Sequence, residues 1–338
     1  MRETRIAIIG CGKQAEKHIS GLSTIPGVEI VLSDSDESRA KALAEKHDLP
    51  WESDVNNIFS NDDIAAVDIC TPTPSHFGLI TAALDSDKDF LCEKPLTATL
   101  GEARELAERI ENSDRVGMVG YIYRFAPVFE LGYSLFKDIP KSGASMVLGS
   151  ISSAFFRLSG RGSHQPWKHT TDEGGGAINE MLVHMVDLAI WYFGPVKNTQ
   201  VLACDLIRPQ RMIANEMHDV DAEDYVLVKL EMENGINVTC QADLVTPAFI
   251  QLADIQGEYG TFAGSIQSHY PSYLHLEREV AGYQSGRNDF QFGQRNLFKA
   301  QMAEFINSVR NGEQPSRSTV KDSVLLMEAM NKIKEEIK

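Results

Sequence analysis

The stretch Ile6-Ala7-Ile8-Ile9-Gly10-Cys11-Gly12-Lys13-Gln14-Ala15 decides the fold of the first part of this chain. Its apolar run leads directly into a G-x-G-x-x-A loop, and a helical pattern follows. In that context Gly10 permits a tight turn, and Gly12 lets the backbone approach a pyrophosphate at the positive end of a helix. The alternative is a purely structural turn. We expect a dinucleotide-binding loop that includes Lys13 and Gln14.

Asp34 supports this interpretation of the loop. It follows Gly12 by 22 residues and stands at the end of the second apolar run. A carboxylate at this place accepts hydrogen bonds from the adenosine ribose and repels a 2′-phosphate. Asp36 adds negative charge, and Arg39 is the one cation close by in the sequence. The pattern predicts NAD in preference to NADP, against the alternative that Asp34 is an ordinary turn residue.

The rest of the chain separates into two kinds of pattern. Up to about residue 121, apolar runs alternate with helical stretches, which predicts βαβ units and a doubly wound parallel sheet, a Rossmann domain at residues 1–121. The runs lie at 6–9, 28–32, 66–70, 90–92 and 116–119, and the helical stretches include 37–47, 75–84 and 100–110.

Beyond residue 121, strand patterns follow one another with little helix between them. They lie at 145–156, 199–206, 225–231 and 236–244, with an Asn-Gly hairpin turn at 232–235 and helical stretches at 177–193, 294–311 and 321–337. This predicts an α+β domain at residues 122–338 with a large, mostly antiparallel open sheet, and the last helices are expected to pack back on the first domain. The fold class is therefore α/β.

Composition excludes several classes of protein. The 338 residues include 48 acidic and 32 basic side chains, a net charge of -16 that disfavours binding to nucleic acid or to anionic lipid. No apolar run approaches the length of a membrane span. The five cysteines have no CxxC spacing, so we expect neither disulfides nor a thiolate metal site, and a cytoplasmic setting.

Two further segments are expected at the carboxyl edge of the parallel sheet, where such sheets bind ligands. The first is Cys70-Thr71-Pro72-Thr73-Pro74-Ser75-His76, whose Thr71, Pro72 and His76 are candidate cofactor contacts, although a histidine at a helix start is more often a surface residue. The second is Glu93-Lys94-Pro95, which places the Lys94 ammonium at the same crevice and allows a cis bond before Pro95. The alternative for Lys94 is a solvent-exposed or paired lysine.

A third segment combines glycines with a polar helix face. Gly174-Gly175-Gly176 precedes a helical pattern on which Glu180, His184 and Asp187 share one face at spacings of four and three. Polar groups on an otherwise apolar helix indicate either an internal hydrogen-bond network or a site, and the residues alone leave both open.

Taken together, these motifs resemble the glucose-fructose oxidoreductase, inositol dehydrogenase and MocA family. The likeness extends to Tyr123-Arg124-Phe125-Ala126-Pro127, to Trp167 and to Gly257-Glu258-Tyr259-Gly260-Thr261. It implies hydride transfer on sugars, inositols or nucleotide sugars, with Lys94, Glu180 and His184 in the active site. The sequence departs from the family at Glu180, where Asp is usual, and at Leu182, where glycine is common.

The resemblance leads to a set of expected roles. His184 is the expected base, Lys94 the group that stabilises alkoxide charge, and Glu180 either orients the imidazole or grips a hydroxyl; no metal is required. Glu93 joins the expected cofactor contacts, and Tyr123, Arg124, Arg157, Arg161 and Trp167 the substrate contacts. The alternatives are a sugar–sugar oxidoreductase with tightly held NAD and a non-catalytic NAD-binding sensor.

Two expectations concern binding partners. Residues 157–169 gather two arginines, a lysine and two histidines, which favours an anionic sugar such as a nucleotide sugar, sugar phosphate or uronate. The alternative is a solvated loop. The open sheet predicts a homodimer or homotetramer.

Overall fold

The computed structural model describes residues 3–137, 139–140, 142–161, 165–172 and 174–337. The chain divides into two compact units, the first formed by residues 1–125 and 294–327 and the second by residues 126–293 and 328–338. Among the described residues, no helix is long and apolar enough to cross a membrane.

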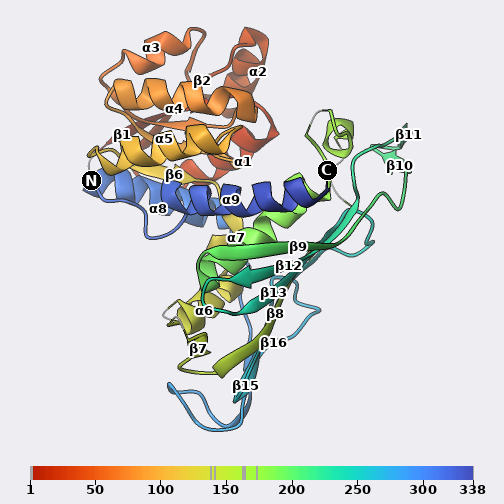
Figure 1. Ribbon diagram of the computed structural model, residues 1–338. Coiled ribbons are helices and arrows are strands. Elements are labelled where there is room, and N and C mark those ends of the chain that lie inside the picture. The colour runs from red at the N-terminus through yellow and green to blue at the C-terminus, as the bar shows by residue number, and fades with distance from the viewer. Residues whose placement is uncertain (1–2, 138, 141, 162–164, 173, 338) are drawn as a thin grey trace. The chain divides into compact units, whose positions relative to one another are not determined.

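The first unit contains a parallel sheet of six strands (Figure 1). The strand order is β3-β2-β1-β4-β5-β6, the Rossmann order, in which the chain reverses direction across the sheet beside β1. Ile6 pairs with Ile30 on one side and with Ala66 on the other, so β1 lies at the centre of the apolar sheet. The strands are β1 Thr4–Ile9, β2 Val28–Ser33, β3 Trp51–Glu52, β4 Ile64–Ile69, β5 Asp89–Cys92 and β6 Gly117–Val119.

Helices pack on this sheet, and several of them begin at side chains that cap them. The helices are α1 Lys13–Leu22, α2 Glu37–His47, α3 Val55–Phe59, η1 Thr73–Ser75, α4 His76–Asp85, α5 Leu100–Glu111, η2 Ile122–Phe125 and α8 Leu297–Asn311. The helices α2, α3, α5 and α8 begin at side chains that cap them. Asp36 accepts a hydrogen bond from Ser38 at the start of α2, and Thr99 forms a capping box with Glu102 at the start of α5. Met302 and Phe305 of α8 belong to the same apolar core as the residues of β1.

The second unit is built on a nine-stranded sheet and a separate hairpin, β10-β11. The strand order is β17-β16-β15-β14-β8-β13-β12-β9, with β7 paired to β8, and only β13 and β8 are parallel neighbours. The strands are β7 Ala144–Ser145, β8 Gly149–Ser159, β9 Val196–Asp205, β10 Gln210–Ile213, β11 Glu216–Asp219, β12 Tyr225–Met232, β13 Asn237–Asp243, β14 Ile250–Gly257, β15 Gly260–Ser265, β16 Ser272–Leu276 and β17 Gly286–Phe290.

Two helices cover one face of the large sheet. α6 Pro127–Phe136 packs on β15, and α7 Val183–Phe193 packs on β8 and β13. Between these helices and the sheet lies an aromatic core formed by Phe136, Phe156, Tyr192, Phe193 and Phe262. Strand residues alternate accordingly: Phe156 is fully buried against the helices, whereas its neighbours Phe155 and Arg157 on the opposite face are half-buried. The remaining helices are η3 Pro166–His169, η4 Ile178–Leu182 and α9 Val320–Ile337, whose residues divide between the two units at 327 and 328.

The predicted α/β class, with a parallel Rossmann sheet and a larger, mostly antiparallel sheet, is confirmed. The hairpin turn is confirmed too, because the Met232 N–H donates to Ile236 at 2.9 Å and Gly235 has a φ of +83°. Several features differ from the predictions. The helix expected at 177–193 begins with a π-helical turn, the helices α3 and α6 were not expected, and the strands β3, β10 and β11 and those from β14 onward were not assigned.

Candidate functional site

The glycine loop between β1 and α1 has the backbone that a dinucleotide requires. Gly10 has a φ of +97°, and a Cβ there would lie 2.8 Å from the carbonyl carbon of Cys70, so only glycine fits. Gly12 precedes the first turn of α1, and a Cβ built there meets no atom within 4 Å. This open space beside the positive end of the helix fits a pyrophosphate. Lys13 is exposed on the same turn.

Asp34 stands beside this loop at the end of β2. Its carboxylate accepts the Cys11 N–H at 2.7 Å and the Asp36 N–H at 2.8 Å, which fixes it against the loop. Arg39, the cation near this position, is paired with Asp36 at 3.2 Å. The edge on which a ribose would lie therefore presents a carboxylate whose orientation is set by the backbone.

His76 joins the two other predicted cofactor segments. Its Nε2 lies 2.8 Å from the carbonyl oxygen of Thr71, and its Nδ1 lies 2.9 Å from the carbonyl oxygen of Pro95. The side chain is 1% exposed, so the interpretation of His76 as a surface residue is wrong. Pro72 is exposed at the start of the intervening turn, and the Lys94–Pro95 bond is cis, as the sequence allowed. His76 therefore ties the 70–76 loop to the segment that carries Lys94.

Glu93, the residue before Lys94, is held by contacts with side chains of α1. Its Oε1 accepts from Gln14 Nε2 at 2.8 Å and lies 3.0 Å from His18 Nε2. Burial raises the pKa of Glu93, but the hydrogen bond and charge of His18 outweigh burial and lower it to about 2. Two predicted cofactor residues, Gln14 and Glu93, are thus in direct contact.

One group of potential metal ligands occurs among the described residues. The ligand atoms of His18, Asp68 and Cys70 lie within 4.8 Å of one another. However, His18 Nδ1 is 2.8 Å from Asp68 Oδ2, a hydrogen-bond distance, and Nε2 is occupied by Glu93. We interpret the group as a hydrogen-bonded network and assign it no metal.

Arg124, a predicted substrate contact, is buried within the first unit. Its side chain is 0% exposed, and Nη1 donates to Asp322 Oδ2 at 2.8 Å. The guanidinium also lies over the ring of Tyr121, 5.2 Å from its centroid. The Arg124 side chain is therefore not accessible to a substrate in this structure, whereas the neighbouring Tyr123 is half-buried.

In the second unit, the glycine segment leads into η4, whose π-helical turn is a feature often found at functional sites. Gly176 has a φ of +99°, and a Cβ there would lie 2.3 Å from Glu223 Oε1. The same carboxylate oxygen accepts the Ile178 N–H at 2.9 Å, and burial raises the pKa of Glu223. Gly176 in turn accepts the Glu180 N–H at 3.0 Å. The glycine and Glu223 together place the turn that carries Glu180.

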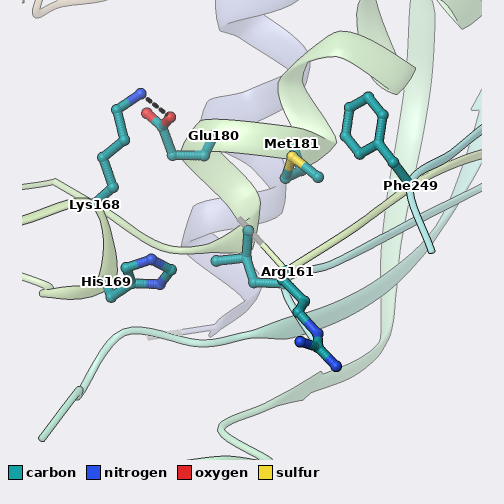
Figure 2. A pocket seen from close by; sticks show the side chains of 7 residues that line it. Arg161, Lys168, His169, Glu180, Met181 and Phe249 are labelled. Carbon is teal, nitrogen blue, oxygen red and sulfur yellow. Dashed lines mark hydrogen bonds and ion pairs between the residues drawn. The ribbon is translucent and has the colours of Figure 1, made fainter. Parts of the chain in front are cut away.

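Glu180 lies at a hollow of about 130 Å³ within the second unit. Figure 2 shows its carboxylate meeting the ammonium of Lys168 in an ion pair, while the guanidinium of Arg161 points away from that pair. The hollow is lined by Arg161, Lys168, His169, Glu180, Met181, Leu244 and Phe249. It combines two cations, one carboxylate and an apolar wall, a composition suited to a polar ring with a charged substituent.

The histidine in this wall has a defined tautomer. His169 Nδ1 lies 2.9 Å from Nη1 of Arg211, and an arginine can only donate. Nδ1 is therefore the acceptor and Nε2 carries the hydrogen. The His169 side chain is 2% exposed, and its contact with Arg211 holds the ring in a fixed orientation.

The other predicted residues of this unit have differing surroundings. Arg157 donates to Ser159 at 2.8 Å and lies 3.5 Å from the carboxylate of Asp243, so its guanidinium is bound to the sheet. Arg161 is exposed, and Trp167 is 41% exposed with the Lys168 ammonium 5.1 Å from its ring centroid. Residues 162–164, which belong to the predicted cationic segment, lie outside the described residues.

His184 lies half-buried in the first turn of α7, and Asp187, three residues on, is 1% exposed. On the polar face expected for this helix, Glu180 and His184 are therefore half-buried and Asp187 is buried. Sequence reasoning did not single out Lys168 or Phe249 as site residues. Lys168 had one available signal, because it belongs to the cationic segment directly before the glycines.

Comparisons with known proteins agree with this geometry. Residues 4–121 match the model described as "Oxidoreductase family, NAD-binding Rossmann fold", and residues 143–263 match the GFO/IDH/MocA C-terminal domain. An inositol 2-dehydrogenase of Acidothermus cellulolyticus is 28% identical over 316 residues, which cover 92% of this chain and 86% of the relative. The uncharacterized oxidoreductase YrbE of Bacillus subtilis is 28% identical over 231 residues, covering 68% of this chain and 63% of the relative.

Among solved structures, a levoglucosan dehydrogenase in complex with NADH and L-sorbose has the same fold. Its TM-score is 0.84 at 19% sequence identity, and the match covers 99% of this chain and 97% of that chain. The two family models together span most of the chain, in the order in which the two sheets occur. The chain therefore belongs to the Gfo/Idh/MocA family of oxidoreductases, with an NAD-binding Rossmann domain followed by the family's C-terminal domain.

Proposed function

We propose that this protein is an NAD-dependent dehydrogenase that oxidises a secondary hydroxyl of a sugar, a sugar derivative or an inositol by reversible hydride transfer. The observation that carries the proposal is the arrangement at the carboxyl edge of the parallel sheet. There the glycine loop with Asp34 follows β1 and β2, and Lys94 follows β5. The related inositol 2-dehydrogenase supports the substrate class.

The preference for NAD is part of the proposal. The Asp34 carboxylate is fixed by two backbone N–H groups and would have to lie beside the additional phosphate of NADP. Arg39, the residue that could offset this repulsion, is already paired with Asp36. Repulsion between the carboxylate and the phosphate therefore favours NAD.

In the proposed mechanism, bound NAD supplies the hydride acceptor. His184 takes the proton of the substrate hydroxyl, the role of a general base. Lys94 hydrogen-bonds the same oxygen and stabilises its developing negative charge. Glu180, placed at the hollow by its π-helical turn and its ion pair with Lys168, grips a neighbouring hydroxyl.

The substrate is proposed to carry an anionic group, such as the phosphate of a nucleotide sugar or sugar phosphate or the carboxylate of a uronate. The hollow presents the cations Arg161 and Lys168 and one carboxylate, that of Glu180, so its formal charge favours an anion. Arg157 is bound to Asp243 and contributes less. Trp167, beside Lys168, offers an apolar ring on which a sugar face packs.

Assembly and location complete the proposal. The face of the large sheet opposite α6 and α7 carries half-buried apolar side chains such as Phe155, Leu227 and Leu252, which favours a homodimer or homotetramer. All five cysteines are free thiols in the structure, which is consistent with a reducing, cytoplasmic setting.

The decisive experiment adds NAD and a panel of neutral and anionic sugars and inositols, and follows NADH by its near-ultraviolet absorbance. Net NADH formation with one substrate is expected, and Lys94→Ala and His184→Ala should each lower turnover at least ~100-fold with little change in NADH affinity. NADH absorbance that rises by only one equivalent per protein with the first sugar, together with catalytic turnover once a second sugar is added, would indicate the sugar–sugar alternative. NADH binding with no turnover of any substrate would indicate a sensor.

A further inference from the structure

His18 is a completely buried histidine of the first unit, and both of its ring nitrogens face carboxylates. Nδ1 lies 2.8 and 3.0 Å from the two oxygens of Asp68, and Nε2 lies 3.0 Å from Glu93 Oε1. The side chains of His18 and Asp68 are 0% exposed, and that of Glu93 is 15% exposed. An ionised carboxylate only accepts hydrogen bonds, so both ring nitrogens must carry hydrogen. His18 is therefore an imidazolium clamped between two acids.

The network continues from Glu93 into the predicted cofactor loop. Glu93 Oε1 accepts from Gln14 Nε2 at 2.8 Å, and Gln14 lies in the first turn of α1, just after the glycines. On the other side of the ring, Cys70 Sγ lies 3.3 Å from His18 Nδ1, and Phe298 of α8 packs 5.7 Å away between ring centroids. The first turn of α1 and the segments that follow β4 and β5 thus meet at one side chain.

We propose that His18 is a positioning residue for the active site, which fixes the Glu93 carboxylate so that Glu93 holds Gln14 beside the dinucleotide loop and binds the ammonium of Lys94 less strongly than it would alone. The first effect rests on the Rossmann domain alone. The second rests on the proposed function, because it requires Lys94 to act on a substrate oxygen.

The balance of charge supports this role. Asp68 and Glu93 bring two negative charges into or beside the core, and His18 and the adjacent Lys94 bring two positive ones. The pKa of His18 is raised well above 6.5: burial lowers it, but the charge and hydrogen bonds of Asp68 and Cys70 raise it by more. The charge of Lys94 also lowers the pKa of Glu93, so the two groups already interact. Without His18, the largely buried Glu93 carboxylate would depend more on the Lys94 ammonium, and Lys94 would be held more firmly beside it.

The test replaces His18 with glutamine, whose single amide group donates to one carboxylate but not to both. NADH affinity is measured by fluorescence titration, and kcat and KM are measured with the best substrate. We expect His18→Gln to raise the NADH dissociation constant about 5-fold through Gln14, and to lower kcat at least ~10-fold with the sugar KM nearly unchanged. His47→Gln, the same substitution in α2 of the same unit, is the matched control and should leave all three values unchanged.

A double-mutant cycle separates positioning from general loosening of the fold. If His18 acts on the cofactor through Gln14, then His18→Gln added to Gln14→Ala should raise the NADH dissociation constant little further, although kcat still falls. If the losses in NADH affinity caused by the two substitutions add fully, His18 does not act on the cofactor through Gln14.

Asp68→Asn provides the second variant should His18→Gln fail to fold, because it keeps the side-chain shape while removing the charge that holds His18. It should also weaken NADH binding and lower kcat. Wild-type NADH affinity and kcat in Asp68→Asn, or in a folded His18→Gln, would overturn the inference. The NADH titration needs no sugar substrate. If the protein oxidises no sugar of the panel, the proposed function is wrong, and the role of His18 is still decided by the NADH affinity of the variants.

Discussion

The glycine before the π-helical turn gives the sharpest test of how the second unit places Glu180. In Gly176→Ala, the added Cβ would lie 2.3 Å from Glu223 Oε1, at a φ of +99°. A side chain in such a backbone conformation costs about 1–3 kcal/mol. Displacing the carboxylate also breaks its 2.9 Å hydrogen bond to Ile178, worth about 1.5–3 kcal/mol for a charged acceptor. We expect a loss of about 3–6 kcal/mol in unfolding free energy.

Calorimetry measures this loss as a fall in the melting temperature of the second unit, on the order of 10 °C or more. Gly174→Ala is the matched control, because Gly174 also has a positive φ, +75°, but a Cβ there meets no atom within 4 Å. It should cost only about 1–2 kcal/mol. Turnover should fall in Gly176→Ala and not in Gly174→Ala, since Gly176 accepts the Glu180 N–H. Equal melting temperatures for the two variants would refute the reasoning.

Four other predictions concern specificity, pH and assembly. NAD should bind at least ~10-fold more tightly than NADP, a difference of about 1.4 kcal/mol, and Asp34→Ala should narrow the gap when both affinities are measured by titration. Arg161→Ala should raise the KM of an anionic substrate far more than that of a neutral sugar, and more than Arg157→Ala does; equal KM values for the two variants would remove Arg161 from substrate recognition. Because the pKa of His18 is raised in the folded protein, its contribution to stability is complete below pH 6.5 and is lost as pH rises through the raised value. Urea unfolding should therefore show a loss of stability at alkaline pH that the His18→Gln variant lacks. The pKa of Glu93 is lowered from 4.5 to about 2, so Glu93 contributes to stability above pH 4.5 and loses this contribution as pH falls toward 2. Light scattering should give a multiple of 37.5 kDa at micromolar concentration, and a monomer there would contradict the proposed assembly.

Local sequence pattern was sufficient for five of the six strands of the first sheet, whereas the two-residue strand β3 was not assigned. β1, β2 and β5 are short apolar runs followed directly by Gly10, Asp34 and Glu93, and a helical period of three and four comes after each. Such signals are contained within a few residues, so they survive without knowledge of the rest of the chain. The strands after β13 lack them, because a half-exposed antiparallel strand mixes polar and apolar residues as β16 and β17 do. The π-helical turn has the same apolar spacing as an α-helix and was therefore expected as one.

Partners of charged residues were much harder to predict than the residues themselves. Arg124 was expected to contact substrate because it belongs to a motif of the family resemblance, and Arg157 because it belongs to the cationic segment, yet Asp322 and Asp243 hold them through contacts between segments far apart in the chain. The alternative for His76, a surface residue, followed from its place at a helix start, but two carbonyl oxygens from separate loops enclose it. Sequence separation conceals such pairs, since a charge pattern does not say which opposite charge the fold will bring to it.

The same reasoning explains why the motif residues occur as groups rather than singly. Gln14 and His18 belong to α1, Asp68 belongs to β4 and Glu93 follows β5, and the strand order β1-β4-β5 brings these three segments to one place. A buried imidazolium is costly unless both nitrogens meet acceptors, and a buried carboxylate is costly unless a cation meets it. Each of these residues therefore stabilises the fold only in the presence of the others. A chain that keeps Glu93, the acid before Lys94, is therefore expected to keep His18 as well. Replacing either residue alone should lower the unfolding free energy more than replacing both. Unfolding of the His18→Gln and Glu93→Gln variants and of their combination would measure this coupling directly.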